Sequence, residues 1–300
     1  MAMRNIIRKI TPKFIIEIFR GFKRYRKRNS LLKAEKEGTG LSQSELENQL
    51  RACGIQEGAT LLVHASLSKI GPVQGGAHTV VSALLSVLGP KGNLLMPSSP
   101  VSGLQLDYVS QNPVFDLRNT PSRMGAISEV FRTLPGVLRS LHPTEPVCAV
   151  GPDADFLTNG HFNQLTPYNA GSPFSRLYEL NGKILYLGVS LDNAGTNLHT
   201  LEDAVDFPYP VYHDELFKLK VIDVNNQAHW MTTKVHNPDF SRRRKCDALI
   251  PLFLQANMAK EITIGLAPSL LFEGDKMFSL MQEAFINNRV TMYTPNGEKL

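Results

Sequence analysis

Cysteine is scarce in this 300-residue sequence, and long apolar runs are missing from it. Its three cysteines, Cys53, Cys148 and Cys246, lie far apart and form no Cys-x-x-Cys pair, which argues against a disulfide framework and a cysteine zinc site. No apolar run approaches the roughly 20 residues that a membrane-spanning helix needs. The N-terminus lacks an uninterrupted apolar core with a small-residue cleavage site, so we expect no secretory signal. Together these absences favour a cytoplasmic protein.

Acidic residues are rare at the start of the chain, where basic residues gather. Residues 1–30 hold ten Lys or Arg and one acid, a net charge of +9, whereas the remainder holds 22 basic and 26 acidic residues, a net charge of −4. From 14 to 28 the apolar residues fall on one side of a helical wheel and nearly all the basic residues on the other, and Pro12 suits a helix start. This pattern predicts a basic amphipathic N-terminal helix.

The composition of that helix favours one kind of partner. Aromatic residues on one face and cations on the other are typical of a helix that lies on an anionic membrane, so residues 1–30 predict peripheral contact with the inner membrane face. Docking on a partner protein or on the body of this protein is the alternative. Nucleic acid is not expected as a partner, because the acidic remainder repels phosphates. The polar residues 29–40 predict a linker, which divides the chain into a leader with its linker, 1–40, and a domain, 41–300.

Helix and strand patterns alternate along this domain. Helix patterns cover 42–53, 77–88, 124–132 and 175–180, and strand patterns cover 60–64, 92–96, 147–150 and 184–189. Residues 218–224 and 229–235 predict a hairpin with a turn at 225–226. Such alternation is typical of a layered α/β domain.

The stretch 184–202 carries the most chemistry. A buried strand pattern ends in a short polar loop, and Thr196, His199 and Glu202 follow at spacings of three. If Thr196 caps a helix, His199 and Glu202 share one helical face, where a carboxylate can orient an imidazole that acts as a general base. The alternative is a helix-start histidine that only caps or packs.

Two other segments suit an anionic ligand. Gly75 and Gly76 precede a helix, so their backbone N–H groups and the helix N-terminus can face a phosphate. Ser122 and Arg123, ahead of another helix, add a hydroxyl and a cation. The loop with the two glycines is neither a P-loop nor a Gly-x-Gly-x-x-Gly motif, and a structural turn explains it equally well.

These segments keep a recognisable order along residues 45–205. They are 62–67, 75–76, 92–97, 120–125 with 131–132, 138–143, 171–173 and 184–202. In this order they resemble the aminoglycoside 3-N-acetyltransferase family. The resemblance implies a single α/β/α sandwich domain with a central mixed sheet, and an N-acetyltransferase that uses acetyl-CoA. It implies that His199 is the catalytic base. The cofactor-binding residues it implies are His64, Ser66, Leu67, Gly75, Gly76, Ser122, Arg123 and Thr196.

The chemistry of the reaction supports these roles. An amine attacks a thioester only as the free base, so a positioned imidazole must take a proton. The tetrahedral intermediate carries an oxyanion, which needs N–H or O–H donors. The reaction requires no metal, and the sequence holds no ligand cluster with metal spacing, so we expect no metal site.

The acceptor side departs from the family. Acidic residues that the family carries downstream correspond loosely to 234–239, where His236 and Asp239 stand in a changed context. Either of them, or Glu202, is the expected partner of His199. The four cations at 242–245 suit an anionic acceptor, such as a nucleotide-linked or lipid-linked amino sugar, although a solvated basic loop explains them too. Asp107 and His142 are further candidate contacts to the acceptor. The alternatives are that Asp107 is a solvated loop carboxylate and that His142 is a packed histidine.

Two functions follow from the sequence. The first is acetyl-CoA-dependent N-acetylation of an amino sugar, either of a surface-polysaccharide pathway or of an aminoglycoside antibiotic. The second is a membrane-associated binding protein that keeps the fold without the activity. The acceptor and the oligomeric state stay open.

Overall fold

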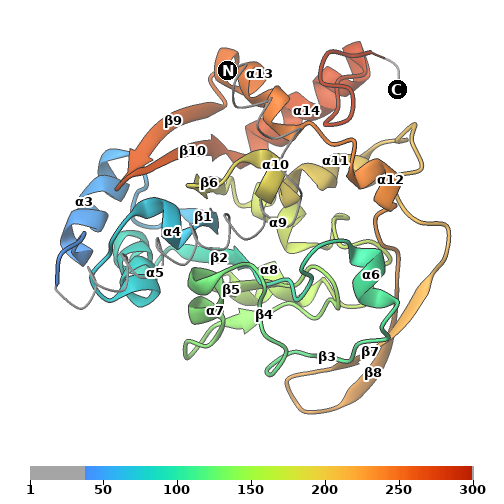
Figure 1. Ribbon diagram of the computed structural model, residues 1–300, viewed down its shortest axis with the longest axis horizontal. Helices are drawn as coiled ribbons and strands as arrows, with labels where there is room; N and C mark the ends of the chain where they lie inside the picture. Colours follow the sequence, from blue (N-terminus) through green and yellow to red (C-terminus); the bar gives the residue numbers. More distant parts are fainter. Residues whose placement is uncertain (1–37, 299–300) are drawn as a thin grey trace, which may run out of the picture.

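A seven-stranded mixed sheet forms the centre of the molecule (Figure 1). The computed structural model describes residues 38–298. The strand order is β4 (Leu138–Arg139), β5 (Val147–Val150), β2 (Asn93–Pro97), β1 (Thr60–Ala65), β6 (Lys183–Leu187), β10 (Ala267–Glu273) and β9 (Ala259–Ile264). The central strands β2, β1 and β6 are parallel, and the outer strands pair antiparallel, so the predicted mixed sheet is confirmed.

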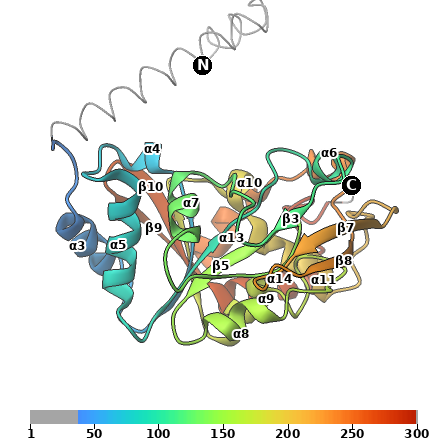
Figure 2. The ribbon, with the colours of Figure 1, turned by 90° about the horizontal axis from the view of Figure 1, so that it is seen from below.

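Both faces of the sheet are apolar because neighbouring strand residues point to opposite sides. Leu61 and Val63 belong to one buried cluster, and Leu62 to the other. The first cluster includes α3 (Gln43–Ala52), α5 (Gly76–Leu88) and α7 (Ala126–Arg132). The second includes α8 (Ala154–Asn159), α9 (Pro173–Glu179), α13 (Ile250–Gln255) and α14 (Gly274–Asn288). Figure 2 shows helices on both sides, and the predicted α/β/α sandwich is confirmed.

The predicted hairpin forms, but outside the central sheet. Strands β7 (Phe217–Ile222) and β8 (Ala228–Thr233) pair antiparallel, and β3 (Phe115–Asp116) joins β7 in a separate three-stranded sheet. Asn226 takes a positive φ of 63° at the turn, a conformation that asparagine tolerates. The chain leaving β8 is thereby directed back toward the loop that follows β6.

The predicted start of the first domain helix is also confirmed. Ser42 caps α3, and the Glu45 carboxylate accepts a hydrogen bond from the Ser42 backbone N–H at 2.8 Å. The amphipathic leader lies outside the described residues, so it and the division at residue 40 stay predictions. No helix within 38–298 is long and apolar enough to cross a membrane.

Short helices gather around the carboxyl ends of the parallel strands. These are α4 (Leu67–Ile70), α6 (Gln105–Val109), α10 (Leu191–Ala194), the 3-10 helix η1 (Thr196–His199), α11 (Thr200–Ala204), α12 (Pro238–Ser241) and η2 (Cys246–Leu249). The loops that leave β1, β2 and β6 start from one edge of the sheet, since parallel strands end on the same side. This is the edge at which α/β sheets place their ligands.

Candidate functional site

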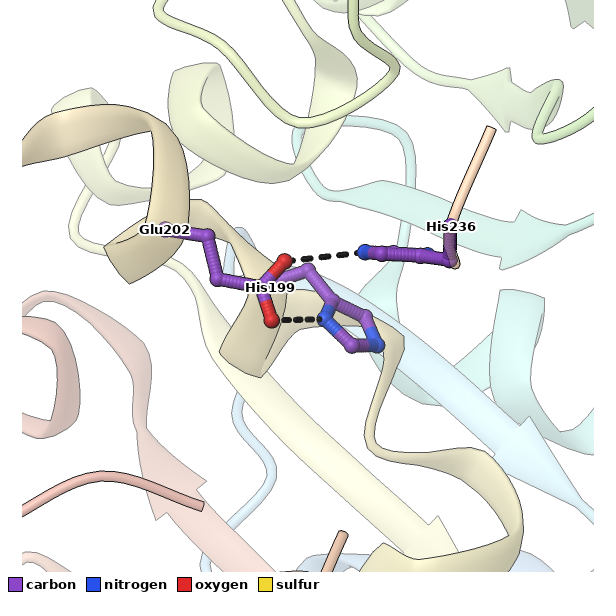
Figure 3. A group of neighbouring side chains, drawn as sticks. All are labelled: His199, Glu202 and His236. Atoms are coloured by element: carbon purple, nitrogen blue, oxygen red, sulfur yellow. Dashed lines mark hydrogen bonds and ion pairs between the residues drawn. The ribbon is translucent and has the colours of Figure 1, made fainter. Parts of the chain in front are cut away.

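His199, Glu202 and His236 form a buried cluster (Figure 3). His199 ends η1 and Glu202 lies on α11, so a spacing of three brings them to one side of the chain. His199 Nδ1 lies 3.0 Å from Glu202 Oε1, an ion-pair distance without the alignment of a good hydrogen bond. His236 Nε2 donates to Glu202 Oε2 at 2.8 Å. One carboxylate thus holds two imidazoles, and His199 Nε2 points away from it (Figure 3).

The predicted helix cap at Thr196 is wrong. Gly195 precedes η1, and the Thr196 hydroxyl is buried without a hydrogen-bond partner. Asn197 anchors the segment instead: its side-chain oxygen accepts from the Tyr186 hydroxyl, and its backbone carbonyl accepts from the Tyr178 hydroxyl. Tyrosines from β6 and α9 therefore fix the short helix that carries His199.

Glu202 is ionised in the middle of this cluster. Burial alone would raise the pKa of Glu202, but His199 and His236 hold it well below its usual value. The Tyr293 hydroxyl donates to Glu202 Oε1 at 2.6 Å and adds a third donor. Burial lowers the pKa of His199 to about 3, against the opposing effect of Glu202, so its ring is neutral at neutral pH.

Aromatic rings hold the two imidazoles in place. Tyr168 lies 4.8 Å from the His199 ring and 5.4 Å from the His236 ring, measured between ring centroids. Tyr212 stacks on His236 at 5.0 Å, and its hydroxyl donates to Asp203. The rings restrict rotation of both histidines and exclude water from the carboxylate.

A cavity of about 220 Å³ lies beside this cluster, at the carboxyl ends of β1 and β2. Three of the residues expected to bind the cofactor line it: His64, Arg123 and Thr196. Two polar atoms of these residues, His64 Nε2 and Thr196 Oγ1, are buried with no hydrogen-bond partner. Burial lowers the pKa of His64 to about 3, and its ring stacks on Tyr186 at 4.9 Å, so it is a neutral, fixed imidazole. Two unpaired polar atoms in one cavity suit a polar ligand.

The other residues expected at the cofactor do not line this cavity. Ser122 is buried, and its hydroxyl accepts from Met124 N and lies 3.2 Å from the hydroxyl of the lining residue Ser128. The remaining four are Ser66 and Leu67 at the start of α4, and Gly75 and Gly76 at the start of α5. Their role in cofactor binding stays a prediction.

The residues expected at the acceptor separate into three positions. His236 is in the cluster. His142 is fully buried, and its Nδ1 accepts from backbone N–H groups of its own loop, so it reaches an acceptor only through other residues. Asp107 and Asp239 are exposed, and Asp239 pairs with Arg242 at 3.3 Å.

Sequence reasoning missed several residues of the site. Gln105, two positions before Asp107, accepts from the backbone N–H of His236 and donates to Glu145 at 2.7 Å. Burial raises the pKa of Glu145 to about 7. The Arg244 guanidinium lies 3.4 Å from the Tyr293 hydroxyl through its Nε. These side chains come from distant parts of the chain, and no local pattern marks them.

The same cluster contains ligand types that metals use. One atom each of His199, Glu202 and His236 lies within 4.8 Å of the others, a grouping that sequence spacing did not indicate. Both oxygens of Glu202 are engaged by imidazole nitrogens and by the Tyr293 hydroxyl. Both carboxylate oxygens are therefore occupied, whereas His199 Nδ1 lies within ion-pair distance of Glu202 without a well-aligned hydrogen bond.

Known proteins resemble this chain in sequence and in fold. The profile of the family described as aminoglycoside 3-N-acetyltransferase matches residues 62–286. Aminoglycoside N(3)-acetyltransferase III of Salmonella sp is 32% identical over 244 residues, which cover 75% of this chain and 84% of that protein. The structure of AAC-VIa bound to sisomicin has a TM-score of 0.71 at 28% identity, covering 84% of this chain and 99% of that one.

A third relative has been solved with a cofactor product. The structure of AAC-IIIb in a binary complex with CoASH has a TM-score of 0.69 at 25% identity, covering 85% of this chain and 99% of that one. The profile match spans well over half of the 300 residues. The chain belongs to the aminoglycoside 3-N-acetyltransferase family.

Proposed function

We propose that this protein transfers the acetyl group of acetyl-CoA to an amine of an amino sugar, with His199 as the general base. The observation that carries the proposal is the His199–Glu202 pair. Three residues before His199, Thr196 lines a cavity that contains unpaired polar atoms. Family membership supports the reaction, and the relative solved with CoASH supports the cofactor.

The geometry divides the work between four side chains. Glu202 faces His199 Nδ1 and favours the tautomer with a proton there, which leaves the Nε2 lone pair free. When the amine attacks the thioester carbonyl, its proton passes to Nε2, and Glu202 stabilises the imidazolium. The carbon–sulfur bond then breaks and CoA leaves as the thiolate, which takes that proton from the His199 imidazolium and returns His199 to its neutral form. His64 Nε2 and the Thr196 hydroxyl are the proposed donors to the oxyanion.

The cavity fits one end of the cofactor. Its volume of about 220 Å³ accommodates the acetyl-thioester end and not a whole CoA molecule. Arg123 is an exposed residue that lines the cavity, and we propose that its guanidinium binds a CoA phosphate outside the cavity. Purified protein should convert acetyl-CoA and an amino sugar into an N-acetyl product detectable by mass spectrometry. If no amine is acetylated and CoA does not bind, the proposal fails.

Replacing Arg123 by alanine should raise KM for acetyl-CoA about tenfold and leave kcat nearly unchanged, because a lost phosphate contact weakens binding before the reaction. Steady-state kinetics at varied acetyl-CoA concentration measure the effect. Arg118→Ala is the matched control, since Arg118 is also exposed but lines a different cavity. An unchanged KM in the Arg123 variant would remove this residue from the cofactor site.

The acceptor has two candidates. The relatives named as aminoglycoside acetyltransferases, one of them bound to sisomicin, support an aminoglycoside. The excess of basic residues at 1–30 favours an amino sugar of a surface-polysaccharide pathway, because lipid-linked sugars are assembled at the cytoplasmic membrane face. A binding protein without turnover is the remaining alternative. Turnover that depends on His199 would exclude it.

Deleting residues 1–30 should abolish binding to vesicles that contain anionic lipid, and should leave acetyl transfer in solution intact. The leader holds +9 of formal charge, and each cation near an anionic surface contributes about 1 kcal/mol. Vesicle co-sedimentation of the full chain and the shortened chain, with neutral vesicles as the control, measures the effect. Equal binding of both chains would refute the membrane contact.

A further inference from the structure

Arg244 is a largely buried cation that lacks an ion-pair partner. Its Nε lies 3.4 Å from the Tyr293 hydroxyl, and its Nη2 is buried without any hydrogen-bond partner. None of the ion pairs within residues 38–298 includes Arg244. Burial of a guanidinium is costly unless an anion or several acceptors compensate it. Burial lowers the pKa of Arg244, but Tyr293 and Glu202 more than offset this and raise it, while no described carboxylate contacts the guanidinium and Nη2 stays unpaired.

The carboxylates nearby do not supply the missing anion. Glu202 directs both oxygens to His199, His236 and Tyr293. Glu145 accepts from Gln105 and feels the charge of Arg244, but lies beyond ion-pair distance of it. Arg244 nevertheless lies close enough to the cluster of His199, Glu202 and His236 for its charge to help lower the pKa of His199.

The neighbouring cations are already engaged. Arg242 is exposed and pairs with Asp239, and the Arg243 guanidinium lies 5.3 Å from the centroid of the Phe240 ring. Arg244 alone among these three turns toward Tyr293 and Glu202. The basic run at 242–245 therefore separates into surface arginines and one arginine that belongs to the site.

We propose that Arg244 binds an anionic group of the acceptor, a phosphate or a carboxylate, while His199 accepts the proton from its amine. The acceptor is then an anionic amino sugar. This inference rests on the proposed function and narrows its substrate class. The planar guanidinium matches two oxygens of either group, and its Nη2 is a buried donor without a partner. A polycationic acceptor would instead place an ammonium group beside a buried cation, which is unfavourable.

The test compares matched acceptors on the full chain. Glucosamine, glucosamine 6-phosphate, glucosamine 1-phosphate and muramic acid differ in the presence and kind of the anion, and kanamycin represents the polycationic class. The kcat/KM for each is measured with saturating acetyl-CoA, for the wild type, Arg244→Gln, Arg244→Lys and Arg243→Gln. We expect the wild type to prefer at least one anionic sugar over glucosamine and over kanamycin. Arg244→Gln should lower kcat/KM for that sugar about 10- to 100-fold more than it lowers kcat/KM for glucosamine.

The other variants separate binding of the anion from a structural role. Arg244→Lys should keep part of the preference for the anionic sugar, because lysine keeps the positive charge but lacks the paired N–H donors of the guanidinium. Arg243→Gln should behave as the wild type. The inference is overturned if the wild type prefers neutral or polycationic amines, or if Arg244→Gln lowers kcat/KM equally for every acceptor. The proposed function itself fails only if no amine on the panel, neutral, anionic or cationic, is acetylated.

Discussion

Replacing His199 by glutamine is expected to lower kcat for acetyl transfer by about 10²–10⁴-fold, the usual contribution of a positioned general base. Glutamine fills much of the same volume but cannot take a proton from the attacking amine. Because the ring does not line the cavity beside it, KM for acetyl-CoA should change little. Stopped assays with product detection by mass spectrometry give kcat, and binding of CoA by calorimetry gives the affinity.

The chain supplies a matched control for this variant. His229 also faces a carboxylate, with its Nε2 2.8 Å from Asp223 Oδ2, but it lies on β8 in the small sheet. His229→Gln should keep wild-type kcat. A His199 variant with kcat within tenfold of the wild type would dismiss His199 as the base. Loss of CoA binding together with kcat would instead indicate a collapsed site.

The sequence predicts the fold well where the signal is periodic. Strand β1 and helix α5 differ from their expected ranges by one residue at one end, because each is a compact apolar pattern between turn residues. The pairing of His199 with Glu202 also follows from a local spacing of three. The local conformation does not: Gly195 takes the position before the helix, so Thr196 begins a 3-10 turn and its hydroxyl is left unpaired.

The missing part of the site depends on long-range contacts. Glu202 meets His236, 34 residues later, and Tyr293, 91 residues later. Neither spacing has a period, and both contacts depend on how the hairpin and α14 return to the sheet. The basic run illustrates the same limit, since four adjacent cations look equivalent until burial distinguishes Arg244 from Arg243. Sequence patterns therefore located the proposed base, whereas its surroundings depend on the tertiary structure.

Replacing Glu202 by glutamine is expected to lower both kcat and stability. The side chain of Glu202 has no exposed surface, and its carboxylate oxygens contact the imidazole nitrogens of His199 and His236 and the hydroxyl of Tyr293. An amide has one oxygen for three donors, and its NH2 group faces one of them, so His199 loses the partner that fixes its tautomer. We expect kcat to fall about 10²–10⁴-fold, as in other sites where the orienting carboxylate of a catalytic histidine becomes an amide.

The stability effect follows from the same contacts. Breaking a buried, paired charge costs about 3 kcal/mol, which for a domain of this size lowers Tm by roughly 6–12 °C. Asp239→Asn provides the comparison: Asp239 is 75% exposed at its side chain and pairs only with Arg242, so Tm should stay within about 2 °C. Calorimetry and steady-state kinetics on both variants distinguish the two possible partners of His199. If Asp239→Asn lost activity as strongly as Glu202→Gln, Glu202 would no longer be the partner that the geometry favours, and the exposed carboxylate would have to move into the site during the reaction.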